Sequence, residues 1–107
     1  MRFENWKKPK IIEGKLTKYN WVVQNLEGLV LGSKTDIGAF TYINALHGVV
    51  IEDNVQIGSH TAIAAKVGIA GSTKIGSHCL IGGASGINGH ITIADGVMFA
   101  GMSMVTK

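Results

Sequence analysis

The feature of this chain that most constrains its fold is a repeat of six residues. From residue 51 onward every sixth residue is large and apolar, and ten consecutive positions keep this phase. These positions are Ile51, Ile57, Ile63, Ile69, Ile75, Ile81, Ile87, Ile93, Phe99 and Val105. A period of six matches neither the 3.6-residue period of a helix nor the alternation of an ordinary strand. The repeat therefore predicts a solenoid, in which short structural units stack on one another.

Two further positions of each repeat indicate how one unit is built. The residue after the large one is usually small, and the fourth residue after it is apolar or slim, as Ile63, Ala64 and Val67 illustrate. This spacing fits a short strand followed by a tight bend, so that three repeats close a triangular coil of about eighteen residues. The large residue then points into the coil, and the slim residue points inward near a corner. Successive coils would pair in parallel at ~4.8 Å.

The repeat also predicts how the chain is organised. Leu31, Ile37 and Ile43 keep the phase, but two extra residues precede Ile51 and predict a small loop near residues 46–50. We expect a single all-β domain of four to five coils over residues 1–107, with an extended leader, an irregular first coil and regular coils at residues 1–15, 16–30 and 31–107. The chain stops directly after a repeat, without a closing helix. Because so few coils bury little core, we expect a side-by-side homotrimer.

Composition and charge exclude several classes of protein. No apolar run approaches the ~18 residues of a membrane helix, and the charged N-terminus does not resemble a signal peptide. We therefore expect a cytoplasmic protein, and the single cysteine, Cys79, falls in an inward slot and fits a reducing compartment. Residues 1–18 carry six basic and two acidic side chains. This local bias does not predict nucleic-acid binding, and it leaves open a solvated leader, an anionic ligand or a neighbouring subunit.

The histidines fall at positions that stacking would align. Residues eighteen apart share a column, so we expect His60 and His78 to lie one coil apart on the same outward face. Such a pair is a metal site, an acid–base site or plain surface; no third ligand is evident, so no metal is expected. His90 belongs to a second column. His47 lies in the inserted segment, where it is either a turn residue or a functional one.

The chain resembles known families over most of its length. Residues 31–105 resemble the hexapeptide-repeat acyltransferases, and this resemblance implies a left-handed parallel β-helix, a known exception to right-handed crossovers. Within that class, three segments resemble the UDP-3-O-acylglucosamine N-acyltransferase of lipid A assembly: TAIAAKVGIAGSTKIG, IGGASGINGH and GMSMV, at residues 61–76, 81–90 and 101–105. Residues 20–60 resemble small sugar acetyltransferases. The join near Ile57–Ile63 indicates either a chimera or a divergent natural protein.

The resemblance implies a reaction and a set of site residues. The expected activity is transfer of an acyl or acetyl group from a pantetheine thioester, acetyl-CoA or acyl carrier protein, to an amino or hydroxyl group of a sugar or nucleotide sugar. His60, His47 and His90 are the candidate catalytic histidines, and His90 matches the second functional histidine of the lipid A enzyme. Gly83, Gly101, Met102 and Met104 are the candidate residues for donor binding, and the two methionines match a stretch that lines the acyl-chain groove in that family.

Three departures from the family support an alternative. The family's N-terminal uridine-binding domain and C-terminal helical extension have no counterpart in this chain. The family's base histidine, in an Ile-Ala-His triplet, corresponds here to Asp53 in Ile51-Glu52-Asp53. A carboxylate is a weak base for an amine or hydroxyl at neutral pH. The alternative is therefore a catalytically inactive, engineered or truncated β-helical trimer scaffold. Carbonic anhydrase on the same fold would need three zinc histidines, and the spacing here does not match that family.

Overall fold

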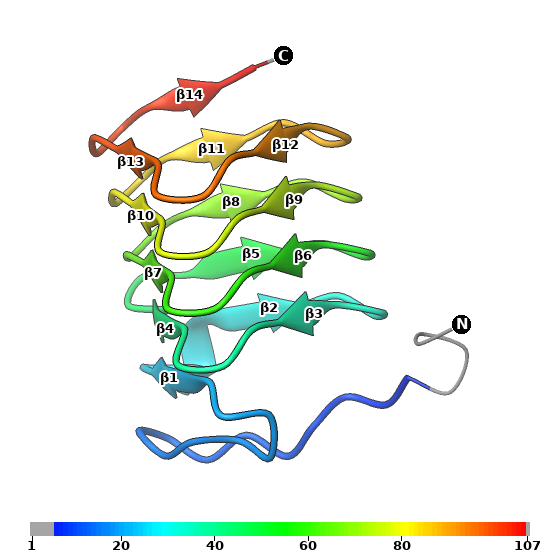
Figure 1. Cartoon of the computed structure of the whole chain (residues 1–107). Helices are drawn as coiled ribbons and strands as arrows, with labels where there is room; N and C mark the ends of the chain where they lie inside the picture. The colour runs from blue at the N-terminus through cyan, green and yellow to red at the C-terminus, as the bar shows by residue number, and fades with distance from the viewer. Residues whose placement is uncertain (1–5, 107) are drawn as a thin grey trace.

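The computed structural model describes residues 6–106 and shows a parallel β-solenoid of about five turns. The chain climbs from β1 at one end to β14 at the other, coil upon coil (Figure 1). The all-β fold predicted from the repeat is confirmed. Its strands are β1 (Val22–Gln24), β2 (Leu29–Leu31), β3 (Asp36–Ile37), β4 (Tyr42–Asn44), β5 (Val49–Ile51), β6 (Gln56–Ile57), β7 (Ala62–Ile63), β8 (Gly68–Ile69), β9 (Lys74–Ile75), β10 (Leu80–Ile81), β11 (Gly86–Ile87), β12 (Thr92–Ile93), β13 (Met98–Phe99) and β14 (Met104–Val105).

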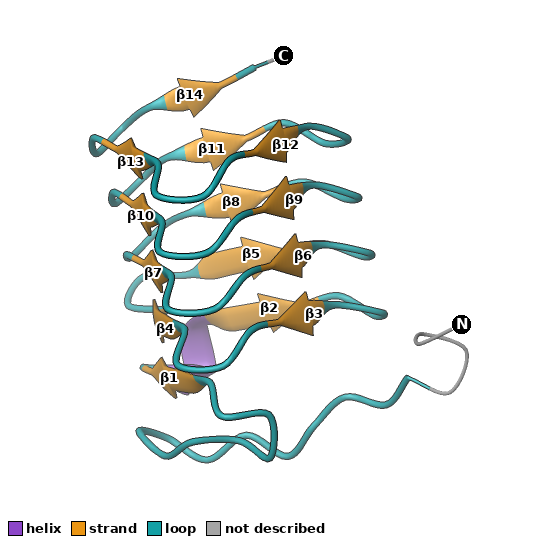
Figure 2. Ribbon diagram, in the orientation of Figure 1, coloured by secondary structure: helices purple, strands orange, loops and turns teal. Residues whose placement is uncertain are grey.

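The strands form three parallel sheets, which are the three sides of the coil. Sheet A contains β1, β4, β7, β10 and β13, sheet B contains β2, β5, β8, β11 and β14, and sheet C contains β3, β6, β9 and β12. Figure 2 shows the strands of each sheet stacked above one another, with loops at the corners that lead from one sheet to the next. Ala62 pairs with Leu80 and Ile63 with Ile81, so the eighteen-residue coil is observed directly. None of the helical segments within residues 6–106 has the length and hydropathy to cross a membrane.

The first two coils are two residues longer than the others. Tyr42 pairs with Val22 on one side and with Ala62 on the other, twenty residues away in each direction. The extra residues of the second coil lie between β4 and β5. The first coil carries the same insertion between β1 and β2, where the 3-10 helix η1 (Leu26–Gly28) forms. The two insertions contact each other, because the Asn25 side-chain amide donates a hydrogen bond of 2.9 Å to Asn44 Oδ1.

The interior is a ladder of isoleucines with slim residues at the corners. Ile43, Ile63 and Ile81 have no exposed surface, and Cys79 is buried among them, as the repeat predicts. The slim corner residues often carry hydroxyl groups, and these bond to the coil above. Thr61 Oγ1, for example, donates to the Gly76 carbonyl at 3.1 Å. Within the described residues every buried side-chain polar atom has a hydrogen-bond partner, so the polar corners cost the core little.

The corners explain where the histidines lie. At each regular corner the third residue after the inward apolar one adopts a left-handed backbone conformation with φ near +60°, and in the inserted turn after Ile43 the fourth residue, His47, does so. All four histidines of the chain occupy such positions, with φ between 55° and 60°. Asn and His are among the side chains that tolerate this conformation best. Each histidine therefore has a structural reason to be where it is, before any chemistry is considered.

The leader closes the N-terminal end of the solenoid. The described part of the leader, together with the turn that follows it, spans residues 6–20 and runs beneath β1 in Figure 1. The Gly14 N–H donates to the Val23 carbonyl at 2.9 Å. The Glu13 carboxylate accepts hydrogen bonds from the backbone N–H groups of Asn25 and Leu26, both at 2.7 Å. Pro9 is buried. The leader thus covers the first coil, whose apolar end would otherwise face solvent.

Two glycines predict opposite effects of adding one methyl group. A Cβ on Gly58 would lie 2.6 Å from the Ser77 nitrogen of the next coil, whereas a Cβ on Gly68 would meet nothing within 4 Å. We expect Gly58→Ala to lower the free energy of unfolding by about 1–3 kcal/mol, because the coils cannot separate to make room. Gly68→Ala should be neutral or slightly stabilising. Urea denaturation of both variants is the measurement, and equal stabilities would contradict the close packing of the coils.

Candidate functional site

A groove runs along the corner between sheets B and C. It crosses the first four coils, so side chains far apart in sequence line it together. The lining residues are Val30, Gly32, Val50, Ile51, Glu52, Asp53, Asn54, Ala70, Gly71, Ser72, Gly89 and His90. Apolar residues of sheet B form one side, and polar corner residues form the other. Such a combination of apolar wall and convergent polar groups is typical of small-molecule sites.

Two carboxylates in the groove are engaged by the backbone. Asp53 Oδ1 accepts a hydrogen bond of 2.8 Å from the Ser33 N–H, and Glu52 Oε1 accepts one of 3.0 Å from the Gly71 N–H. Both bonds connect neighbouring coils. The Asp53 side chain therefore serves as a link between turns.

His90 lies in the groove together with an available backbone donor. Its own N–H donates to the Gly71 carbonyl at 3.1 Å, and its side chain is exposed. The N–H of the preceding residue, Gly89, has no hydrogen-bond partner within residues 6–106. The equivalent N–H groups of Ser33 and Gly71 are the ones that the carboxylates cap. Within residues 6–106 the His90 turn therefore combines an exposed histidine side chain with a backbone N–H that has no partner.

A shallow apolar trough extends the groove across sheet B. Gly68 and Gly86 leave the outer face of this sheet without side chains, between Val50 and Met104. Val50, Glu52 and Ala70 line both hollows, so groove and trough are continuous. An extended apolar chain has the shape and polarity that such a trough accommodates.

His60 lies on a different corner, between sheets C and A. Its ring stacks on that of His78, with the centroids 4.9 Å apart and the planes within 2° of parallel. The expectation that these two histidines lie one coil apart on one face is confirmed. Phe40 packs on the other side of His60, at 5.4 Å between centroids. Within residues 6–106 no three His, Cys, Asp or Glu side chains gather as a metal site would require.

His47 lies on the third corner, between sheets A and B, in the left-handed position of the inserted turn. Gly83, Gly101 and Met102 belong to the same corner, in later coils. Met104 instead points outward from sheet B, where its side chain is 72% exposed. A single chain therefore does not bring His47, His60 and His90 together. The eighteen-residue spacing already placed His60 and His90 in different columns, and the structure adds that His47 lies on the remaining corner.

The three outer faces differ in polarity. Sheet A presents a ladder of exposed apolar side chains, among them Tyr42, Leu80 and Met98. Sheet B presents Val30, Val50 and Met104. Sheet C presents Asp36, Gln56, Lys74 and Thr92 at the same positions. Two faces thus have the character of contact surfaces, and one has the character of a solvated surface.

The repeat, the three parallel sheets and the corner groove define a hexapeptide-repeat parallel β-helix protein. No family model matches the chain. Curated proteins named UDP-3-O-acylglucosamine N-acyltransferase are similar to it. That of Pseudomonas aeruginosa (strain LESB58) is 48% identical over 99 residues, 79% of this chain and 28% of that protein. That of Hahella chejuensis is 43% identical over 104 residues, which cover 83% of this chain and 30% of that protein. That of Delftia acidovorans is 40% identical over 102 residues, which cover 81% of this chain and 30% of that protein.

The extent of these matches carries two consequences. The chain spans less than a third of the length of these relatives, so they match it in the β-helix and not across a whole enzyme. The match to the Pseudomonas protein covers 79% of this chain, whereas residues 61–105 make up less than half of it. The similarity to this family therefore extends upstream of residue 61, beyond the segments in which the sequence motifs occur.

Proposed function

We propose that this chain provides the catalytic β-helix of an acyltransferase that acts on a nucleotide sugar. The acyl group would come from a pantetheine thioester, carried by coenzyme A or by acyl carrier protein, and would pass to an amino or hydroxyl group of the sugar. The observation that carries this proposal is 48% identity, over 79% of the chain, with proteins named for N-acyl transfer to such a sugar. Because both donors belong to the cytoplasm, we propose that compartment as well.

His90 is the base that the groove favours. In its neutral form the imidazole accepts a proton from the acceptor nitrogen or oxygen as this atom attacks the thioester carbonyl carbon. The carbonyl oxygen becomes negatively charged, and the Gly89 N–H is the donor available in the same turn to stabilise it. Collapse of the intermediate breaks the carbon–sulfur bond, and the departing thiolate takes the proton from the imidazolium. His60 and His47 are the rival candidates on the other two corners.

A homotrimer would complete this site. The apolar ladders of sheets A and B are the surfaces that side-by-side association would cover, while the polar face of sheet C stays in solvent. The donor arm would lie in the trough beside Met104. The corner with His47, Gly83, Gly101 and Met102 would then approach the groove from a neighbouring subunit, so that residues separated within one chain meet across the interface.

A second candidate, an inactive scaffold, is favoured by two specific observations. The Asp53 carboxylate, at the position of the family's base, accepts a hydrogen bond from the Ser33 backbone. All four histidines also have a structural role at left-handed corners. A chain that only needs to fold and trimerise would have both features.

Donor binding and transfer distinguish the two candidates. We expect coenzyme A at 100 times its Kd to raise the free energy of unfolding by about 2.7 kcal/mol, measured by thermal melting against a matched concentration of adenosine diphosphate. We also expect thiol release from an acyl thioester only when a UDP-amino sugar is present. Absence of both effects at millimolar donor would leave the scaffold as the remaining explanation.

A further inference from the structure

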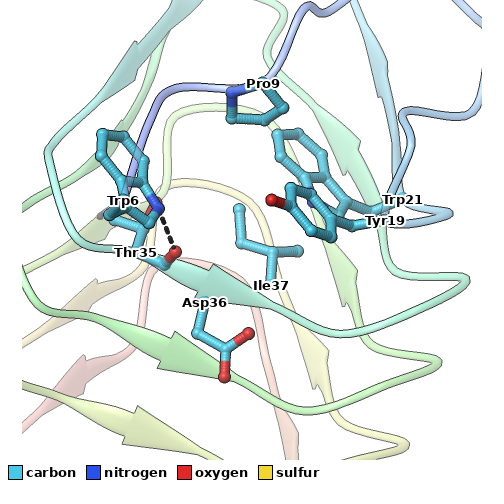
Figure 3. Close-up of a pocket in the computed structure, with 7 residues that line it drawn as sticks. All are labelled: Trp6, Pro9, Tyr19, Trp21, Thr35, Asp36 and Ile37. Carbon is cyan, nitrogen blue, oxygen red and sulfur yellow. Dashed lines mark hydrogen bonds between the residues drawn. The ribbon is translucent and has the colours of Figure 1, made fainter. Parts of the chain in front are cut away.

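An aromatic cavity lies at the N-terminal end of the solenoid, where the leader meets the first coil. Its volume is about 140 Å³. Figure 3 shows Trp6 on one side and Tyr19 and Trp21 on the other, with Ile37 between them and Pro9 closing the top. Thr35 and Asp36 complete the lining. We call this cavity the aromatic slot.

The walls of the aromatic slot are held in place. The Trp6 indole N–H donates to the Thr35 carbonyl at 2.9 Å, across 29 residues of sequence. Trp21 is only 2% exposed, and its ring lies against the core. Tyr19 is 50% exposed and forms the open side. An apolar cavity of about 150 Å³ accommodates benzene, so this slot has room for one planar ring and not for a whole nucleotide.

Several lysines flank residues of the slot lining, which also contains one carboxylate, that of Asp36. Lys18 lies over the Tyr19 ring, with Nζ 5.1 Å from the centroid. Four further exposed lysines are direct sequence neighbours of lining residues: Lys7, Lys8, Lys10 and Lys34. Aromatic cages also bind quaternary ammonium ions, but a rim of lysines repels a cation. The surroundings favour a ligand with a planar ring and a negative charge next to it.

We propose that the aromatic slot binds the base of a nucleoside diphosphate, with the phosphates held by the lysine rim. This inference rests on the proposed function, because it gives the nucleotide half of the acceptor a place on this chain. The slot and the groove share the turn between β2 and β3: Gly32 lines the groove and Thr35 lines the slot. A base in the slot would therefore direct its diphosphate and sugar toward the corner that carries Asp53 and His90.

Tryptophan fluorescence reports on this site directly, because the only two tryptophans of the chain both line the slot. We expect UDP to quench the emission in a saturable manner, uridine to quench it with at least tenfold weaker affinity, and pyrophosphate or choline to leave it unchanged. Tyr19→Ala should raise the Kd for UDP at least tenfold. Tyr42→Ala is the matched control, since it removes the other tyrosine of the chain, which is exposed on sheet A and does not line the slot.

The lysine rim has its own test. Lys7→Glu combined with Lys8→Glu should weaken UDP at least tenfold and leave uridine unchanged, whereas Lys66→Glu combined with Lys74→Glu should affect neither. The proposal is overturned if millimolar UDP does not quench, if Tyr19→Ala binds UDP normally, or if pyrophosphate or choline quenches as UDP does. Thiol release in the groove is measured separately. Transfer without base binding would therefore remove this inference alone, and base binding without transfer would remove only the proposed function.

Discussion

Replacing His90 with asparagine should lower kcat/KM for acyl transfer by a factor of about 10² to 10⁴, the usual contribution of a general base. The fold should be unaffected. His90 occupies a left-handed corner with φ of 60°, and asparagine is one of the residues that adopt this conformation readily. The substitution therefore removes the imidazole and keeps the corner, so a loss of rate with an unchanged Tm can be assigned to chemistry. Steady-state thiol release and thermal melting are the two measurements.

The same substitution at other corners tests the assignment. His78→Asn alters an equivalent left-handed position on the corner between sheets C and A. It should leave the rate of acyl transfer within about threefold of the parent. His60→Asn and His47→Asn examine the rival bases. If one of these two loses activity while His90→Asn retains it, the base lies on another corner, and the groove between sheets B and C is not where the proton is transferred.

Replacing Ile75 with alanine should lower the free energy of unfolding by about 2–5 kcal/mol, because a buried Leu or Ile truncated to Ala loses its transfer energy and leaves a cavity. Ile75 is 4% exposed and packs in the ladder of the third coil. Each coil contacts only the coils above and below it. A destabilised coil therefore interrupts the coupling between the two ends of the solenoid. Chemical denaturation followed by far-ultraviolet circular dichroism measures the loss.

The adjacent residue is the control for that substitution. Lys74 shares strand β9 with Ile75, but its side chain points to the polar outer face of sheet C. Lys74→Ala should change the stability by no more than about 0.5 kcal/mol. If both substitutions lower the free energy of unfolding by the same amount, then inward and outward positions do not alternate as described, and the repeat has been assigned to the wrong phase.

The architecture was predictable because its determinants are local and recur. The phase of Ile63, Ile75 and Ile81 indicated which residues face inward, how many residues form a coil and which strands pair, and all three appear as predicted. The shared face of His60 and His78 followed from the same spacing. These successes rest on one period, since a chain that returns to the same place every eighteen residues needs no further information to align its columns.

Other features were missed for identifiable reasons. The insertion between Val23 and Leu31 was not recognised, although its spacing of eight equals the one between Ile43 and Ile51. The left-handed conformation of every corner gives the histidines a structural role that their spacing alone does not reveal. The pairing of Asp53 with Ser33 depends on the length of the inserted coil, which sets which turn lies above which.

By itself, the sequence determined the solenoid, its interior and the outward direction of the candidate side chains, because each of these depends on a repeat only six residues long. The tertiary structure alone decided which outward residues meet. Val30, Gly71 and His90 share a groove only because coils stack in register, and Trp6 and Trp21 face each other only because the leader folds back beneath the first coil. Contacts of this kind arise from the packing of separate segments, and no local period encodes them.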